Sequence, residues 1–109
     1  MKRFALALDL KNDEKMIAEY EAYHKKLRPE IEASIRESGI IGMEIYRFTN
    51  RLFMIMETVD DFSFERKAAM DEGNEKVAEW EALMWTYQQP VPGALPGQKW
   101  ILMDKIFEL

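Results

Sequence analysis

The order in which strand-like and helix-like runs follow one another is the feature that most restricts the fold of this chain. Its 109 residues begin with an alternating run at 4–10 that is typical of a strand. Two further β-rich runs, 43–48 and 52–57, are separated by the short stretch 49–51, which predicts a hairpin. A last β-rich run covers 100–107. Helical periodicity fills the intervals before and after the hairpin.

The first helical interval is interrupted by a proline. Asn12 or Asp13 can cap a helix that runs to about Leu27, because a short polar side chain accepts from the free amides of the first turn. Pro29 has no amide hydrogen and its ring meets the carbonyl one turn back, so it predicts a break and the start of a second helical piece. Gly39 suits the left-handed residue that ends such a helix.

The second helical interval also divides in two. Asp60 or Asp61 is expected to cap a short helix that runs to about Asp71, with Gly73 as its stop and Asn74 as the next cap. The following helix carries an inward stripe at spacings of three and four, formed by Val77, Trp80, Met84 and Tyr87. Three prolines and two glycines then predict an irregular loop over residues 88–98, before the last strand.

The resulting order, β-α-β-β-α-β, is the plan of a ferredoxin-like α+β sandwich, with one antiparallel sheet and helices on one face. The length allows a single domain, residues 1–109. Several strand positions are apolar on both sides of the sheet, as where Phe53 stands beside Met54 and Ile55. We therefore expect the uncovered face to pack against a second copy, giving a homodimer in the form of a dimeric α+β barrel.

Composition excludes several classes of function. The net charge is −5 and the basic residues are scattered, so no nucleic-acid partner is expected. The absence of cysteine and the presence of one histidine exclude disulfide frameworks and the usual zinc and non-haem iron sites. No apolar run approaches the about 20 residues that cross a bilayer, and the first residues lack a signal-peptide pattern. A cytoplasmic protein without a membrane partner is expected.

The histidine, His24, lies on the inward face of the first helix, one turn after Tyr20. Imidazole can exchange a proton near neutral pH, although an inward histidine is more often a structural residue. Trp80 on the later helix can supply an aromatic wall. Carboxylates that could assist are Asp9, Glu44, Glu57, Glu81 and Asp104. An imidazole, a phenol and aromatic walls suit proton transfer on a neutral organic ligand, whereas glycine loops for phosphate and clusters of metal ligands are absent.

The motif Tyr20-Glu21-Ala22-Tyr23-His24, followed by Pro29-Glu30 and Gly39, resembles the N-terminal motif of the L-rhamnose mutarotase family. The resemblance covers essentially the whole chain, and it continues at Ile45-Tyr46, Leu52-Phe53, Trp80, Met84 and Ile106-Phe107. It implies a ferredoxin-like domain that dimerises through its sheets. It also implies an enzyme without a cofactor that interconverts the α and β anomers of a 6-deoxy-L-hexose.

The resemblance also assigns roles to residues. The family's general acid matches His24, and its sugar-binding tyrosine one turn earlier matches Tyr20. Of a tryptophan pair that contacts the sugar, the first matches Trp80 and the second is replaced by Glu81; a further binding tyrosine corresponds to Met43. The reaction is thus retained while two sugar contacts are altered. Either L-fucose or L-rhamnose remains possible as substrate, and the chain looks closer to members of L-fucose utilisation.

Mutarotation requires that the ring oxygen gain a proton while the C1 hydroxyl loses one. One imidazole can act as acid in ring opening and as base in closing, with a carboxylate or bound water as its partner. Two alternatives share this architecture: a non-enzymatic dimeric binding module, and a cofactor-free monooxygenase or haem-handling protein. The fold does not separate them. The combination of Tyr20, His24 and Trp80 favours the mutarotase.

Overall fold

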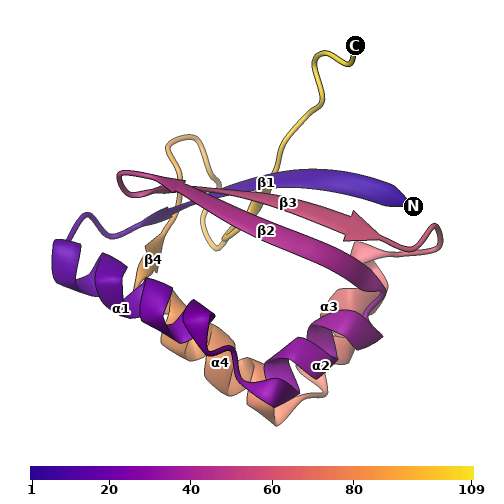
Figure 1. Cartoon of the computed structure of the whole chain (residues 1–109), viewed down its shortest axis with the longest axis horizontal. Coiled ribbons are helices and arrows are strands. Elements are labelled where there is room, and N and C mark those ends of the chain that lie inside the picture. The colour runs from indigo at the N-terminus through magenta and orange to yellow at the C-terminus, as the bar shows by residue number, and fades with distance from the viewer.

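One antiparallel sheet carries all the helices on one of its faces (Figure 1). In this computed structural model, which describes residues 1–109, three long strands form the sheet in the order β2 (Ile40–Phe48), β3 (Arg51–Thr58) and β1 (Lys2–Leu10). Two short strands, β4 (Gln88–Gln89) and β5 (Ile101–Leu102), both pair with β1. The ferredoxin-like arrangement expected from the order of elements is confirmed.

The four predicted helical pieces are all present. They are α1 (Glu14–Lys25), α2 (Pro29–Glu37), α3 (Phe64–Glu72) and α4 (Glu75–Trp85). Each long connection between strands therefore supplies a pair of helices to the same layer (Figure 1). None of the helices combines the length and the apolar character that spanning a membrane requires.

Local chemistry fixes the first pair of helices. The Asp13 carboxylate accepts from the Met16 amide at 3.0 Å and caps α1, while Pro29 occupies the first turn of α2. Gly39 follows α2 with φ +100°, a conformation that a Cβ atom disfavours. A Cβ there would also lie 3.0 Å from the Val59 Cγ2 atom. The break, the second start and the stop are thus confirmed.

One predicted helix cap is wrong. Neither Asp60 nor Asp61 begins α3; the cap is Ser63, whose hydroxyl accepts from the Arg66 amide at 3.2 Å. Asp60 instead pairs with the amino terminus of the chain, which β1 brings close to it. Asn74 caps α4 as predicted.

The apolar core lies between the sheet and the helix layer in two clusters. One contains Leu6, Ile40, Met54, Met56 and Phe62, and the other contains Leu10, Tyr20, Leu52 and Met84. Of the stripe predicted on α4, Val77 and Met84 are buried and Trp80 is partly buried, whereas Tyr87 follows the end of the helix. The second cluster supports the segment of α1 that carries His24.

The end of the chain departs from the prediction. The loop predicted at 88–98 begins with a strand, because Gln88 and Gln89 pair with Leu10 and Asp9 of β1. The strand predicted at 100–107 is reduced to Ile101–Leu102. The remaining residues leave the sheet as an extended tail (Figure 1). Beyond the bond from the Met103 amide to the Ala5 carbonyl, the tail has no strand partner within one chain.

Candidate active site

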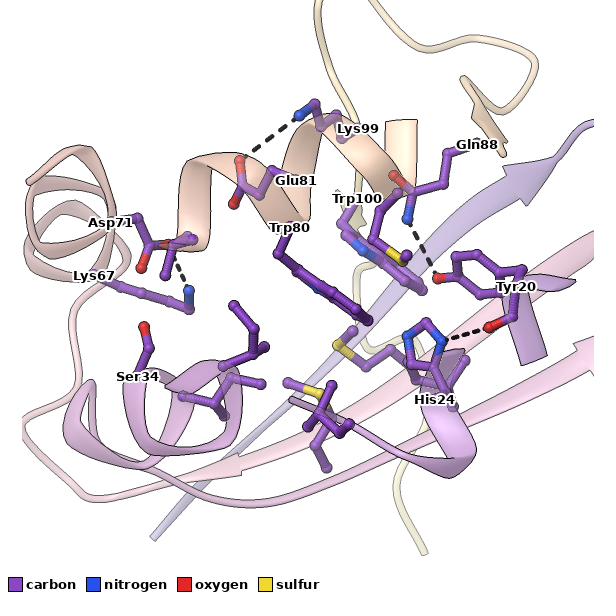
Figure 2. A pocket seen from close by; sticks show the side chains of 18 residues that line it. Tyr20, His24, Ser34, Lys67, Asp71, Trp80, Glu81, Gln88, Lys99 and Trp100 are labelled. Atoms are coloured by element: carbon purple, nitrogen blue, oxygen red, sulfur yellow. Dashed lines mark hydrogen bonds and ion pairs between the residues drawn. The ribbon is translucent and has the colours of Figure 1, made fainter. Parts of the chain in front are cut away.

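A cavity of about 220 Å³ lies between the sheet and the helix layer (Figure 2). All five residues singled out from the sequence line it: Tyr20, His24, Met43, Trp80 and Glu81. Tyr20 and His24 come from α1, Met43 from β2, and Trp80 and Glu81 from α4. The fold therefore gathers residues that are separated by up to 61 positions, from 20 to 81, around one space.

The imidazole of His24 is oriented by its own helix. Its Nδ1 atom lies 2.9 Å from the backbone carbonyl oxygen of Tyr20. A carbonyl oxygen can only accept, so Nδ1 carries the hydrogen and the neutral ring has its lone pair on Nε2. Figure 2 shows this second nitrogen on the side of Trp80, away from the bonded carbonyl. The arrangement leaves Nε2 available to a molecule in the cavity.

Tyr20 is held beside His24 in the core. The two ring centroids are 4.4 Å apart, and only 4% of Tyr20 is exposed. The Gln88 side-chain amide donates to its hydroxyl oxygen at 3.3 Å. Burial raises the pKa of Tyr20 above its usual value, although the bond from Gln88 works in the opposite direction. The phenol is therefore neutral at physiological pH.

Gln88 is a site residue that sequence reasoning missed. The sequence predicts an irregular loop at this position, since Gln88 stands just before a segment rich in proline and glycine. The structure places it in β4, where pairing with Leu10 of β1 fixes the backbone and buries the side chain. No local pattern in the sequence indicated that pairing.

Trp80 forms an aromatic wall of the cavity. The centroid of its ring lies 5.6 Å from that of the His24 ring, and the guanidinium carbon of Arg28 lies 5.5 Å from the Trp80 ring centroid. Trp100 lines the same cavity (Figure 2). Apolar and aromatic side chains with a few polar groups are typical of small-molecule sites, and an aromatic face suits the C–H surface of a sugar.

An ion pair that sequence reasoning also missed lies at the end of the cavity away from Tyr20 and His24. The Lys67 ammonium and the Asp71 carboxylate of α3 are 2.7 Å apart and partly buried, and Ser34 of α2 lies beside them (Figure 2). In sequence this pair resembles an ordinary surface ion pair one helical turn apart. The cavity thus has polar groups at both ends and apolar walls between them.

The carboxylates considered from the sequence fall into two groups. Glu81 lines the cavity, but its side chain is 51% exposed and lies 3.7 Å from the Lys99 ammonium. The other four, Asp9, Glu44, Glu57 and Asp104, do not line it. Asp9 instead accepts two hydrogen bonds from Arg51, at 2.8 and 3.1 Å. No group of three histidine or carboxylate side chains is arranged to hold a metal ion.

Comparison with known sequences gives one family. The model of L-rhamnose mutarotase matches residues 3–109. An L-fucose mutarotase from Xanthomonas campestris pv. campestris is 41% identical over 111 residues, which cover 100% of this chain and 89% of that protein. A UPF0734 protein from Dictyostelium discoideum is 34% identical, with 99% of this chain and 90% of that protein covered.

Solved structures confirm the fold. The crystal structure of an L-rhamnose mutarotase from Formosa agariphila has a TM-score of 0.73 at 23% identity, with 100% of this chain and 99% of that one covered. The tetracenomycin F2 cyclase of Streptomyces glaucescens, a type-II polyketide cyclase, has a TM-score of 0.65 at 16% identity, covering 100% and 97%. A dimeric ferredoxin-like protein from an uncultured marine organism has a TM-score of 0.54 at 9% identity, covering 98% and 90%.

Proposed function

We propose that this chain, which belongs to the L-rhamnose mutarotase family, is a carbohydrate isomerase that interconverts the α and β anomers of L-fucose or L-rhamnose. The observation that carries the proposal is the orientation of His24. Its Nδ1–H bond to the α1 backbone leaves Nε2 for a ligand in a cavity that Tyr20 and Trp80 also line. A 6-deoxy-L-hexose has the required character, with hydroxyl groups at its edge and C–H groups on its faces.

In this proposal His24 exchanges protons at the anomeric centre, and four residues bind the sugar. Trp80 covers a C–H face, while Tyr20, Met43 and Glu81 lie around the ring. Ring opening to the aldehyde, rotation and reclosure move only protons and one C–O bond. The reaction therefore needs no cofactor.

The alternative functions fit the cavity less well. The cavity has polar groups at both ends and apolar walls between them, which suits a small ligand rich in hydroxyl groups better than a large apolar group such as haem. A simple binding module would not require an oriented histidine whose ring packs against a neutral phenol in the cavity.

The direct test is anomer exchange measured by saturation-transfer NMR. The purified chain is expected to accelerate exchange of L-fucose, L-rhamnose or both above the rate in buffer. D-glucose, which has a hydroxymethyl group in place of the methyl group at C5, serves as the control sugar. A chain that accelerates neither deoxysugar but gives a Soret band with haem would contradict the proposal in favour of the haem-handling alternative.

We also propose a homodimer formed through the face of the sheet that the helices leave uncovered. On β2 and β3, Tyr46 and Phe53 lie opposite each other on this face, and Phe48 extends it with 80% exposure. The apolar tail residues Ile106 and Phe107 are 95% and 75% exposed. Exposed apolar surface of this extent is typical of an interaction site.

Light scattering at micromolar concentration is expected to give about 26 kDa, twice the 12.9 kDa of one chain. Phe48→Asp should shift the mass toward the monomer, because it places a charge in the proposed interface. The matched control is Leu95→Asp, which introduces the same charge in the exposed loop before β5 and should leave the mass unchanged. A monomer mass for the wild type would refute the dimer.

A further inference from the structure

We propose that the Tyr20 hydroxyl is the acid partner of His24, donating its proton to the ring oxygen while Nε2 of His24 takes the proton of the C1 hydroxyl. Gln88 is the residue that positions the Tyr20 hydroxyl. This inference rests on the mutarotase function proposed above. It assigns the second proton-transfer group, which the sequence left open as a carboxylate or water, and it makes His24 the base in ring opening, in place of the acid that the family resemblance implies.

The reaction itself restricts where the second group can be. The ring oxygen and the C1 hydroxyl oxygen are bonded to the same carbon, so the two protein groups must reach neighbouring atoms. Tyr20 is suited to this condition, because it lines the same cavity as His24 and the two ring centroids are only 4.4 Å apart. The cavity carboxylates do not suit the role as well. Asp71 is bonded to Lys67 at the far end, and Glu81 is half-exposed beside Lys99 (Figure 2).

The directions of the hydrogen bonds assign opposite roles to the two groups. Nδ1–H of His24 donates to the Tyr20 carbonyl, so the neutral imidazole presents a lone pair and acts as a base. The Gln88 amide donates to the Tyr20 hydroxyl oxygen, which leaves the hydroxyl hydrogen free for another acceptor. The bond from Gln88 is the one hydrogen bond that the hydroxyl makes with a protein side chain. The hydroxyl hydrogen is therefore available to a sugar oxygen in the cavity.

Burial and Gln88 act on the Tyr20 proton in opposite directions. Burial raises the pKa of Tyr20 and keeps the phenol protonated before the substrate binds, whereas the hydrogen bond from Gln88 lowers the pKa and favours release of the proton. The N–H group of Gln88 bonds better to a phenolate than to a phenol, since hydrogen bonds to charged groups are the stronger ones. Gln88 is itself only 6% exposed, and water therefore does not replace it easily. It thus stabilises the charge that develops on Tyr20 as the proton leaves.

The proton balance closes over one turnover. In ring opening, the electron pair of the C1–O5 bond passes to O5, which takes the proton of Tyr20. The C1 hydroxyl gives its proton to Nε2 of His24 and becomes the aldehyde oxygen. The site then holds a phenolate and an imidazolium, with no change in net charge. Rotation about C1–C2 presents the other aldehyde face, and the reverse transfers close the ring and restore both residues.

The test compares two tyrosines of α1 in the full-length protein. Tyr20→Phe removes the hydroxyl and retains the ring that packs in the core, whereas Tyr23→Phe removes a hydroxyl that does not line the cavity. With L-fucose and L-rhamnose, Tyr20→Phe is expected to lower kcat by about 10²-fold, the lower end of the range for acid–base catalysis. KM should change far less, and Tyr23→Phe should match the wild type.

A second pair of variants, at Gln88 and Gln89, tests whether Gln88 positions the Tyr20 hydroxyl. Gln88→Met removes the amide donor at similar side-chain length, and it is expected to lower kcat several-fold with little change in KM. Gln89→Met, on the neighbouring residue of β4 outside the cavity, should leave both constants unchanged. If Gln88 acts only through packing, its substitution lowers the melting temperature and leaves kcat unaltered, which contradicts the positioning role.

The outcomes separate this inference from the function on which it rests. A wild type that accelerates neither deoxysugar overturns the mutarotase function and the role of Tyr20 together. An active wild type whose Tyr20→Phe variant retains kcat and shows only a raised KM overturns the acid role alone, because the hydroxyl then binds substrate and transition state equally. Loss of kcat at nearly constant KM, in a variant that melts like the wild type, confirms it.

Discussion

His24→Ala is expected to lower the rate of anomer exchange by about 10²–10⁴-fold, the range that a positioned acid or base contributes. The chain has no second histidine to take over the proton. The fold should survive, because His24 lies near the end of α1 and its side-chain hydrogen bond goes to its own helix. Saturation-transfer NMR on L-fucose and L-rhamnose measures the rate, and circular dichroism checks the fold.

Rescue of His24→Ala by free imidazole tests whether the missing side chain itself is responsible for the loss of activity. The space left by the side chain should admit imidazole from solution, so His24→Ala should recover part of its activity in a concentration-dependent manner. Tyr20→Phe retains His24 and should not respond. A His24→Ala variant with the full exchange rate would show that the imidazole does not take part in the reaction.

The second large effect is expected at the two positions where this chain departs from its family. Met43→Tyr combined with Glu81→Trp should shift the preference toward L-rhamnose by about 5- to 150-fold in the ratio of kcat/KM values, since an unpaired buried polar group costs about 1–3 kcal/mol. L-Fucose and L-rhamnose share the C6 methyl group and differ in configuration at C2 and C4. Hydrogen bonds to hydroxyl groups must therefore distinguish them.

The structure makes both positions suitable for this role, because Met43 and Glu81 line the same cavity as His24. The matched control is Met43→Leu combined with Glu79→Trp. It keeps an apolar residue on β2 and places the same tryptophan and charge change on α4, at a residue outside the cavity. Exchange rates on both sugars decide the outcome. An unchanged ratio in the folded double variant means that these positions do not select the substrate.

Much of the candidate site could be predicted because it depends on local periodicity. Tyr20 and His24 are one helical turn apart, so any helix over this segment places them on one face. The interruption at Pro29 and the stop at Gly39 follow from backbone chemistry that each residue carries with it. The order of strands and helices then leaves few ways to assemble one sheet with a single helix layer.

Contacts between distant segments could not be predicted in this way. Gln88 bonds to Tyr20 across 68 positions of sequence, and it does so because β4 pairs with the end of β1. The strand-like tail, by contrast, finds no strand partner within its own chain beyond Met103. Likewise, Asp60 pairs with the amino terminus and leaves Ser63 as the cap of α3.

A pattern of residues specifies what a segment can form, whereas the neighbour that it meets depends on how the whole chain packs. The sequence by itself therefore determined the element order and the Tyr20–His24 face, and only the tertiary structure decided which side chains complete the cavity around them.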